Sequence, residues 1–369
     1  MTVTRRQFTL AGILLSGAAA GSLYAHQNKK HAVDSELILS AADSDNQHYL
    51  LLTDMHGRPQ LSVSVSQRAH DVAYNAATQY AVFFPRRPGT EMVTIDLGKR
   101  HSPKRIKSAP GTHFYGHGVF SADGRWLFTT ENEFDTGRGI IAVYDAADQF
   151  KRVRVMDCGG IGPHQLAWMN DQRTLVVAIG GILTNPASER DKLNIDTMQP
   201  ALTYIDSETG NIIDSFRPQH HQMSIRHLAV SSRDQVIIGV QFEGPAWQSV
   251  PLVLSHCGET ALQPMADNSH WPMLNQYIAS VAISADGKQA ITTTPRGSLV
   301  SRWNLDDLSL INAVGVRDVA GAAYSHHRQQ FVVSNGIGQL FSLGEEKPKL
   351  VTLANLPAIH WDNHLALIS

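Results

Sequence analysis

Cysteine is scarce in this chain of 369 residues, which contains only Cys158 and Cys257. Neither residue belongs to a CxxC or CxxCH motif, so the sequence gives no support for a thiol redox centre or for covalently attached haem. The two cysteines could pair in an oxidising compartment, but their position in the sequence does not decide whether they do.

The usual catalytic signatures are also missing. The sequence contains no GxSxG nucleophile elbow, no HExxH zinc motif and no Walker or Rossmann glycine pattern, and no helical pattern follows the glycines at 160–165. The formal net charge is only −2, so no basic field invites nucleic acid. These absences favour a binding protein over an enzyme, although an isolated histidine or glutamate could still act as a general base.

The first 25 residues are typical of an export signal. Arg5 and Arg6 precede a weakly apolar stretch rich in glycine and alanine, and the candidate cleavage positions are Ala20 and Ala25. Because the T-R-R-x-F pattern is typical of twin-arginine signals, we expect removal of residues 1–25 and a periplasmic mature protein. A membrane anchor is the alternative, but the apolar run is short for a span, which needs about 20 residues. We therefore expect no stable membrane span after cleavage.

Helical periodicity is almost absent after residue 36, and short runs with a period of two take its place. Apolar runs alternate with Gly, Asp, Asn and Pro in a recurring unit. The unit is clearest at 116–146 and 281–307, which share the tight turn S-A-D-G. His70, His117 and His164 follow one another at intervals of 47 residues. A period of about 40 to 50 residues with three or four strands per unit predicts a β-propeller.

The ends of the chain complete this count. Six units lie between residues 70 and 343, whereas residues 36–65 contain strands but no inner strand. The terminal HWDNHLALIS at 360–369 resembles the inner strands of the other units. We therefore predict an all-β, seven-bladed propeller over residues 36–369, in which the C-terminal strand completes the N-terminal blade and removes two sheet edges. A six-bladed ring with a stray tail is the alternative.

Histidines stand at the start of the predicted inner strands, and in a propeller these positions converge on the central channel. Neutral imidazole is a ready ligand of transition metals, so iron or another transition metal is the cofactor that the pattern suggests, at a metal or anion site at the channel mouth. The alternative is structural, because a histidine at this position can hold the next strand by hydrogen bonds. The candidate metal ligands are His113, His117, His164, His227 and His364, and His70 occupies an equivalent position.

The register of the strands counts against a complete ring of histidines. His117 and His227 lie four residues before the turn of their unit, whereas His70 and His164 lie five residues before it. A slip of one residue turns a side chain to the opposite face of a strand. All of these rings can therefore face one channel only where β-bulges intervene.

Two further segments carry candidate binding residues. Arg86 and Arg87 stand on a turn made by two prolines and a glycine, and paired guanidinium groups suit carboxylates and phosphates; an ordinary solvated turn is the alternative. Glu131, near the end of a predicted strand, is a third candidate ligand-binding residue. The long excursion at 180–202 either covers one face of the channel or is a simple insertion.

Several segments resemble a known bacterial family. They are RRPGT (86–90), HFYGHGVFSADG (113–124), GIGPHQL (160–166), SIRHLA (224–229) and the terminal WDNHL (361–365). Together they are similar to the bacterial domain-of-unknown-function family fifteen-thirteen, from about residue 37 to the end. Ile179 departs from the pattern, since the family carries a polar residue there. The resemblance implies an exported seven-bladed propeller of the YVTN/WD40-like type, often encoded beside imelysin-type iron-uptake proteins and di-haem peroxidase-like proteins.

Two classes of function follow from these observations. The first is a periplasmic binding module, accessory to iron uptake or to a haem or redox partner, with an imelysin-type or di-haem peroxidase-like protein as the partner. The second is an enzyme, either a lactonase-like hydrolase or the large subunit of a dehydrogenase, with its site on the propeller axis. Metal analysis of the purified protein would begin to separate them.

Overall fold

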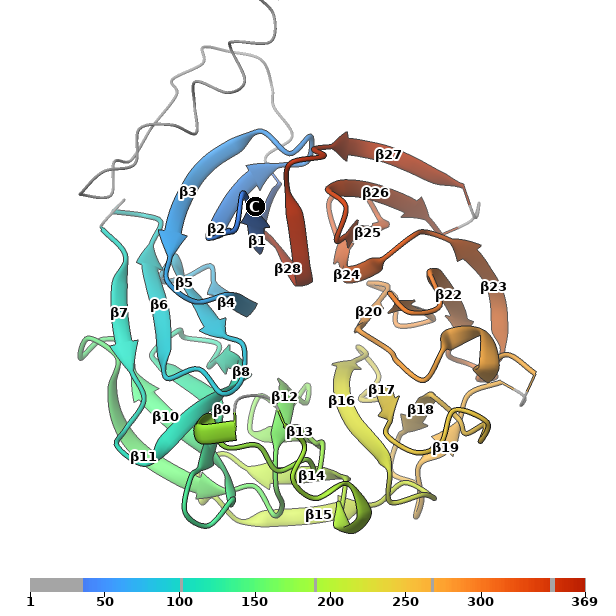
Figure 1. Cartoon of the computed structure of the whole chain (residues 1–369), viewed down its shortest axis with the longest axis horizontal. Coiled ribbons are helices and arrows are strands. Elements are labelled where there is room, and N and C mark those ends of the chain that lie inside the picture. The colour runs from blue at the N-terminus through green and yellow to red at the C-terminus, as the bar shows by residue number, and fades with distance from the viewer. Residues whose placement is uncertain (1–35, 100–101, 189–190, 267–268, 346–348, 369) are drawn as a thin grey trace, which may run out of the picture.

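The computed structural model describes residues 36–99, 102–188, 191–266, 269–345 and 349–368. Within these residues, seven four-stranded antiparallel sheets are arranged around a central axis (Figure 1). The predicted seven-bladed propeller is confirmed, and the six-bladed alternative is wrong.

The predicted signal at 1–25 lies outside the described residues. In the part of the chain that is described, no helix is long and apolar enough to cross a membrane. The helical elements there are the short 3₁₀ turns η1 (Pro186–Ser188), η2 (Ile195–Thr197) and η3 (Trp271–Leu274).

Each blade runs from an inner strand at the channel to an outer strand at the rim. Blade 1 consists of β28 (His360–Ile368), β1 (Leu37–Ser44), β2 (Gln47–Asp54) and β3 (Pro59–Val65). Blade 2 consists of β4 (Ala69–Asn75), β5 (Tyr80–Pro85), β6 (Glu91–Asp96) and β7 (Lys104–Lys107). Blade 3 consists of β8 (Thr112–Phe120), β9 (Trp126–Glu133), β10 (Gly139–Asp145) and β11 (Lys151–Asp157). Blade 4 consists of β12 (Pro163–Trp168), β13 (Thr174–Ile179), β14 (Ala201–Asp206) and β15 (Ile212–Phe216), and blade 5 of β16 (Met223–Val230), β17 (Val236–Phe242), β18 (Val253–His256) and β19 (Gln263–Pro264). Blade 6 consists of β20 (Ser280–Ile283), β21 (Gln289–Thr294), β22 (Leu299–Asn304) and β23 (Leu310–Gly315), and blade 7 of β24 (Val319–Ser325), β25 (Gln330–Asn335), β26 (Gln339–Gly344) and β27 (Leu350–Asn355).

The apolar core lies between neighbouring blades. Phe128 of blade 3 packs in one cluster with Leu175 and Val177 of blade 4, and Leu39 of blade 1 packs with Phe83 of blade 2. Each such side chain contributes about 1.5–3 kcal/mol when fully buried. The inter-blade packing fixes where each inner strand stands around the axis.

The outer strands are partly exposed and alternate between polar and apolar residues. In β11 the sequence KRVRVMD places Val153 and Val155 at the surface. Because these strands are largely exposed and some are very short, as β7 and β19 are, the sequence pattern predicted three or four strands for each unit.

The C-terminal strand closes the ring as predicted. β28 pairs antiparallel with β1, so that Leu37 lies opposite Ile368 and Asp43 opposite His360. Ser40 Oγ also donates a hydrogen bond of 2.7 Å to the carbonyl of His364. The closure leaves blade 1 with four strands drawn from both ends of the chain (Figure 1).

The two cysteines do not form a disulfide within the described residues. Cys158 is buried and Cys257 is exposed. Burial raises the pKa of the Cys158 thiol to about 12, so this thiol is unreactive at neutral pH.

We predict that Leu365→Ala on β28 lowers the free energy of unfolding by about 2–5 kcal/mol, the usual cost of truncating a buried leucine. Leu365 is 7% exposed and packs between blades 1 and 7. The control Val351→Ala, on outer strand β27 where the side chain is 50% exposed, should change it by no more than about 0.5 kcal/mol. Urea unfolding measures both. If Leu365→Ala and Val351→Ala lower the free energy of unfolding by the same small amount, β28 does not belong to the cooperatively folding unit.

Candidate functional site

Five histidines from five blades meet on the propeller axis within the described residues. Their ring centroids lie 4.6 Å apart for His117 and His164 and 4.8 Å apart for His164 and His227, which confirms the predicted convergence of these three. We call the group the histidine cluster; its members are His70, His117, His164, His227 and His364, with further centroid distances from 4.7 to 6.4 Å.

β-Bulges bring all five rings to the same channel despite the mismatch in sequence register. A bulge adds a residue to one strand and re-aims the side chains beside it. A shift in strand pairing falls at or beside each of the five histidines: between Ala69 and Asp71, between Phe114 and Gly118, between Pro163 and Leu166, between Ile225 and His227, and, opposite the residues from Trp361 to Leu365, between Ser40 and Ala42.

Gly116 allows one of these bulges to pack closely. Its φ of +112° lies in a region that residues with a side chain rarely adopt. A Cβ at this position would also come within 2.8 Å of Cδ2 of His70. Glycine therefore both permits the bend in β8 and makes room for the neighbouring imidazole.

Hydrogen bonds to other blades orient three of the five rings. Nδ1 of His117 lies 2.8 Å from Oδ2 of Asp71, and Nδ1 of His70 lies 3.2 Å from Oδ1 of Asp362. Nδ1 of His364 lies 3.1 Å from Oγ of Ser280. The first two bonds link adjacent blades, as the structural interpretation expected, and the third links blade 1 to blade 6. In all three the partner is a side chain.

Other nitrogens of the cluster are buried without a partner. In the described part of the chain, no hydrogen-bond partner reaches His117 Nε2, His164 Nδ1, His364 Nε2 or either nitrogen of His227. A carboxylate on one ring nitrogen and an unpartnered second nitrogen, as in His117, is the arrangement typical of histidine metal ligands.

The donor atoms of the cluster are close enough to form two overlapping groups of ligands. One group is His70, His117 and His364, the other is His117, His164 and His227, and within each the donor atoms lie within 4.8 Å of one another. Burial lowers the pKa of His70, His164 and His227 well below the ordinary 6.5 and that of His364 to about 4. These four rings are therefore neutral at pH 7, with lone pairs available for a metal.

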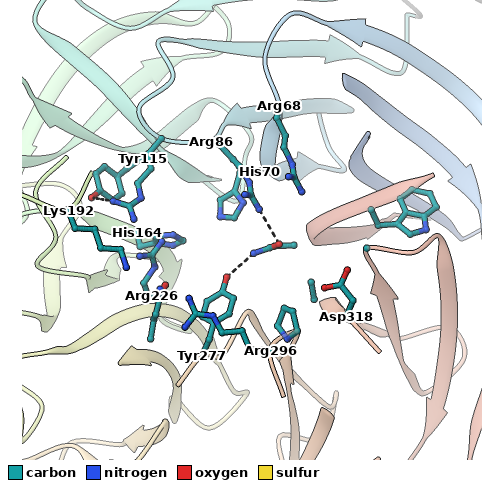
Figure 2. A pocket seen from close by; sticks show the side chains of 17 residues that line it. Arg68, His70, Arg86, Tyr115, His164, Lys192, Arg226, Tyr277, Arg296 and Asp318 are labelled. Carbon is teal, nitrogen blue, oxygen red and sulfur yellow. Dashed lines mark hydrogen bonds between the residues drawn. The ribbon is translucent and has the colours of Figure 1, made fainter. Parts of the chain in front are cut away.

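A pocket of about 420 Å³ adjoins the histidine cluster, since His70 and His164 line it (Figure 2). We call it the axial pocket. Its cationic lining residues are Arg68, Arg86, Arg87, Lys192, Arg226 and Arg296. Burial and the neighbouring Arg87 lower the pKa of Arg226 to about 10, so Arg226 remains charged at neutral pH.

The structure brings some of the predicted site residues to this pocket. Arg86 and Arg87, the two candidate anion-binding residues of the turn, both line it. Lys192, from the excursion at 180–202, lines it as well, so this segment reaches the channel mouth. Arg87 Nη1 donates a hydrogen bond of 3.0 Å to the hydroxyl of Tyr115.

His113 and Glu131 lie elsewhere, and neither belongs to the ligand groups nor lines the axial pocket. The ring of His113 stacks on Tyr115 and Phe134, with Nδ1 at 3.0 Å from the carbonyl of Phe114. Glu131 is fully buried and accepts hydrogen bonds from Thr112, Thr129 and Tyr144. Their surroundings favour a role inside blade 3.

Several residues of the site were not singled out by the sequence pattern. Arg226 directly precedes His227, Asp71 directly follows His70, and Arg68 stands two residues before His70. Their proximity to the repeated histidines was a usable signal. The contribution of Arg296 and Tyr277 to the pocket had no comparable mark in the sequence.

Comparisons with known proteins agree with the fold. A family model described as "Protein of unknown function (DUF1513)" matches residues 63–368. Hydrazine synthase of Kuenenia stuttgartiensis is similar at 14% identity and a TM-score of 0.57, over 83% of this chain and 88% of that chain. A chain of a mitotic checkpoint complex is similar at 15% identity and a TM-score of 0.59, over 78% and 79%. A search of curated proteins finds no match. At these identities the two structures support the fold alone.

We predict that metal-free protein loses stability as the pH falls from about 6.5 toward 4, the interval between the ordinary histidine pKa and the lowered pKa of His364. The unfolded chain binds more protons than the folded chain in this interval, so the free energy of unfolding decreases on acidification by about 1.4 kcal/mol per pH unit for each proton. Urea unfolding at several pH values measures the slope. His227→Leu should make the slope shallower by the contribution of about one proton. A flat profile between pH 5 and 6.5 would contradict the prediction.

Proposed function

Because this chain belongs to the DUF1513 family, whose function is not established, we propose its function from the site: it is a periplasmic binding module that holds a transition-metal ion in the histidine cluster. The T-R-R-x-F pattern near the start of the sequence, which is typical of twin-arginine signals, supports the location. A role accessory to iron uptake, beside an imelysin-type or di-haem peroxidase-like partner, is part of the same proposal and has its support in the family resemblance.

The observation that carries the proposal is the set of buried imidazole nitrogens that have no partner among the described residues. A buried polar atom without a hydrogen bond costs about 1–3 kcal/mol. Five such nitrogens on four rings of one cluster are therefore expensive, unless a ligand satisfies them. An imidazole ring offers at most one lone pair, so a metal ion satisfies one nitrogen on each of these four rings, four of the five, and the N–H of His227 needs an acceptor of its own.

The geometry needs only small movements to close around an ion. Two nitrogens that share an ion at about 2.1 Å are at most about 4.2 Å apart, and the donor atoms of each group lie within 4.8 Å. His117 belongs to both groups, and Asp71 fixes its ring through Nδ1. His117 is therefore the ligand on which the site depends most.

The ligand set favours particular metals. Imidazole suits Fe²⁺, Cu²⁺ and Zn²⁺, whereas Mg²⁺ and Ca²⁺ prefer oxygen ligands. Asp71 and Asp362 contact the rings through hydrogen bonds, so they would tune the imidazoles as outer partners. Iron is thus compatible with the cluster, and the competing metals are tested beside it.

An enzyme with its site on the axis is the second candidate, and one observation favours it. His70 lines the axial pocket, and Nδ1 of its ring lies 3.2 Å from the carboxylate of Asp362. A histidine oriented by a carboxylate is the arrangement of a general base. If the hydrolase alternative is correct, the wild type hydrolyses a lactone and the His70→Gln variant does not.

We predict that the purified protein, loaded separately with Fe²⁺, Zn²⁺ or Cu²⁺ and dialysed, retains about one ion per chain of at least one of them. Elemental analysis measures the ratio. His117→Gln and His227→Gln should lose the ion, because each removes a ligand from a cluster that stays folded.

The matched control is His113→Gln, which changes a buried histidine outside both ligand groups and should keep the metal. Circular dichroism and the melting temperature check that each variant is folded. The proposal would be contradicted by a wild-type protein that binds none of the three metals, or by a His117→Gln variant that keeps the wild-type ratio of metal to protein.

A further inference from the structure

The axial pocket has an excess of positive charge. Six cationic side chains line it, against one carboxylate, that of Asp318, among the described residues of its lining. In the view of Figure 2, Arg226 and Lys192 lie on the side of His164, and Asp318 lies on the opposite side.

Three of the six cations have carboxylate partners outside the lining. Arg68 Nε lies 2.5 Å from Oδ2 of Asp362, and Arg86 Nη2 lies 3.3 Å from Oδ1 of the same residue. Lys192 forms an ion pair with Glu243. These pairs hold three walls of the pocket in place and leave little charge free for a ligand.

The other three cations, Arg87, Arg226 and Arg296, have no carboxylate within ion-pair distance in the described residues. Arg296 is exposed and lies 5.1 Å from the ring centroid of Tyr277. Arg87 and Arg226 are each only 6% exposed, and the Nε of each is buried without a hydrogen-bond partner. Two buried guanidinium groups without an anion are costly to hold in a fold.

We propose that the axial pocket binds a small organic polycarboxylate, whose carboxylates are held by Arg87, Arg226 and Arg296. A guanidinium group binds a carboxylate through two parallel hydrogen bonds, so three groups match a ligand of about three negative charges. A cavity of about 420 Å³ is within the range of small-molecule sites, about 300–1,000 Å³, and exceeds what a single phosphate fills.

The neighbouring polar side chains suit the same ligand class. Gln241, Tyr277 and Asn363 line the pocket and offer amide and hydroxyl groups, and Asn363 already donates a hydrogen bond of 2.8 Å to the hydroxyl of Tyr277. Such groups recognise hydroxyls and carboxylate oxygens. Trp361, Ala320 and Pro295 and the rings of Tyr115 and Tyr277 are the apolar part of the lining, and the six cations of the same lining favour an anion over an uncharged lipid or aromatic ligand.

The anion would lie next to the histidine cluster, since His164 lines the same pocket. In metal-loaded protein a carboxylate of the ligand would come beside the ion. This coupling rests on the proposed function, whereas binding of the anion itself requires the arginines alone. The two can therefore fail separately.

The experiment is isothermal titration of metal-free protein, prepared with 1,10-phenanthroline because this chelator has no carboxylate, in Tris chloride at low salt. The probes are citrate, tricarballylate, succinate and inorganic phosphate. Citrate and tricarballylate should bind with equal stoichiometry, and succinate and phosphate at least about 10-fold more weakly, because each lost carboxylate leaves one guanidinium group unpaired.

Substitution identifies the binding groups. Arg226→Met and Arg87→Met should each weaken citrate binding by about 10- to 100-fold, the usual effect of losing a charge-assisted hydrogen-bonded pair. The control Arg173→Met changes a surface arginine that pairs with Asp206 outside the pocket, and it should bind citrate as the wild type does.

Several outcomes would overturn the proposal. They are the absence of heat with any carboxylate, phosphate binding as tight as that of citrate, and an Arg226→Met variant with wild-type affinity. Citrate binding that requires added metal would refute the arginine site and leave the proposed metal site standing. Citrate binding without any metal affinity would support the inference and refute the proposed function.

We also predict that Arg226→Met does not destabilise the protein in anion-free buffer and raises its melting temperature, because it removes a buried charge without an ion pair. Citrate should raise the melting temperature of the wild type by binding the folded state, and at the same citrate concentration it should raise that of Arg226→Met less. Thermal scanning with and without citrate measures both effects. A variant that melts well below the wild type would show that Arg226 has a structural partner.

Discussion

Asp362 lies on the closing strand β28, and its buried carboxylate contacts Arg68, Arg86 and His70. These partners come from the other end of the domain in sequence, so one carboxylate joins ring closure, the axial pocket and the histidine cluster. The charged and hydrogen-bonded neighbours hold the pKa of Asp362 far below its usual range. Any ligand site on this axis depends on that contact, because it positions one wall of the pocket and one ring of the cluster.

The propeller separates the groups that stabilise it from the groups that serve the site. The apolar clusters lie between blades, as in the packing of Phe128 against Leu175, and they supply most of the buried apolar surface that holds the blades together. Inner strands can therefore carry bulges, unpaired imidazoles and buried guanidinium groups that a single-core fold would exclude. Departures from local rules of this kind are expected at functional sites.

Much of the fold was predictable because its signals are repeated. The spacing of His70, His117 and His164 predicted the blades, and the likeness of HWDNHLALIS to other inner strands predicted the closure. The outer strands were harder, since several of them are short or largely exposed, such as β7 and β19. The bulges could not be predicted, because strand register is set by pairing between chain segments. The burial of Arg226 could not be predicted for the same reason, because Arg226 lies in the shift in strand pairing between Ile225 and His227.

The two proposed sites also constrain each other. A divalent cation that approaches the histidine cluster through the axial pocket passes Arg87 and Arg226, whose charges repel it, and in a buried setting such repulsion is poorly screened. A polycarboxylate on those arginines would remove the repulsion and offer the ion oxygen ligands beside His164. On electrostatic grounds, metal binding from this side should therefore be favoured by the anion.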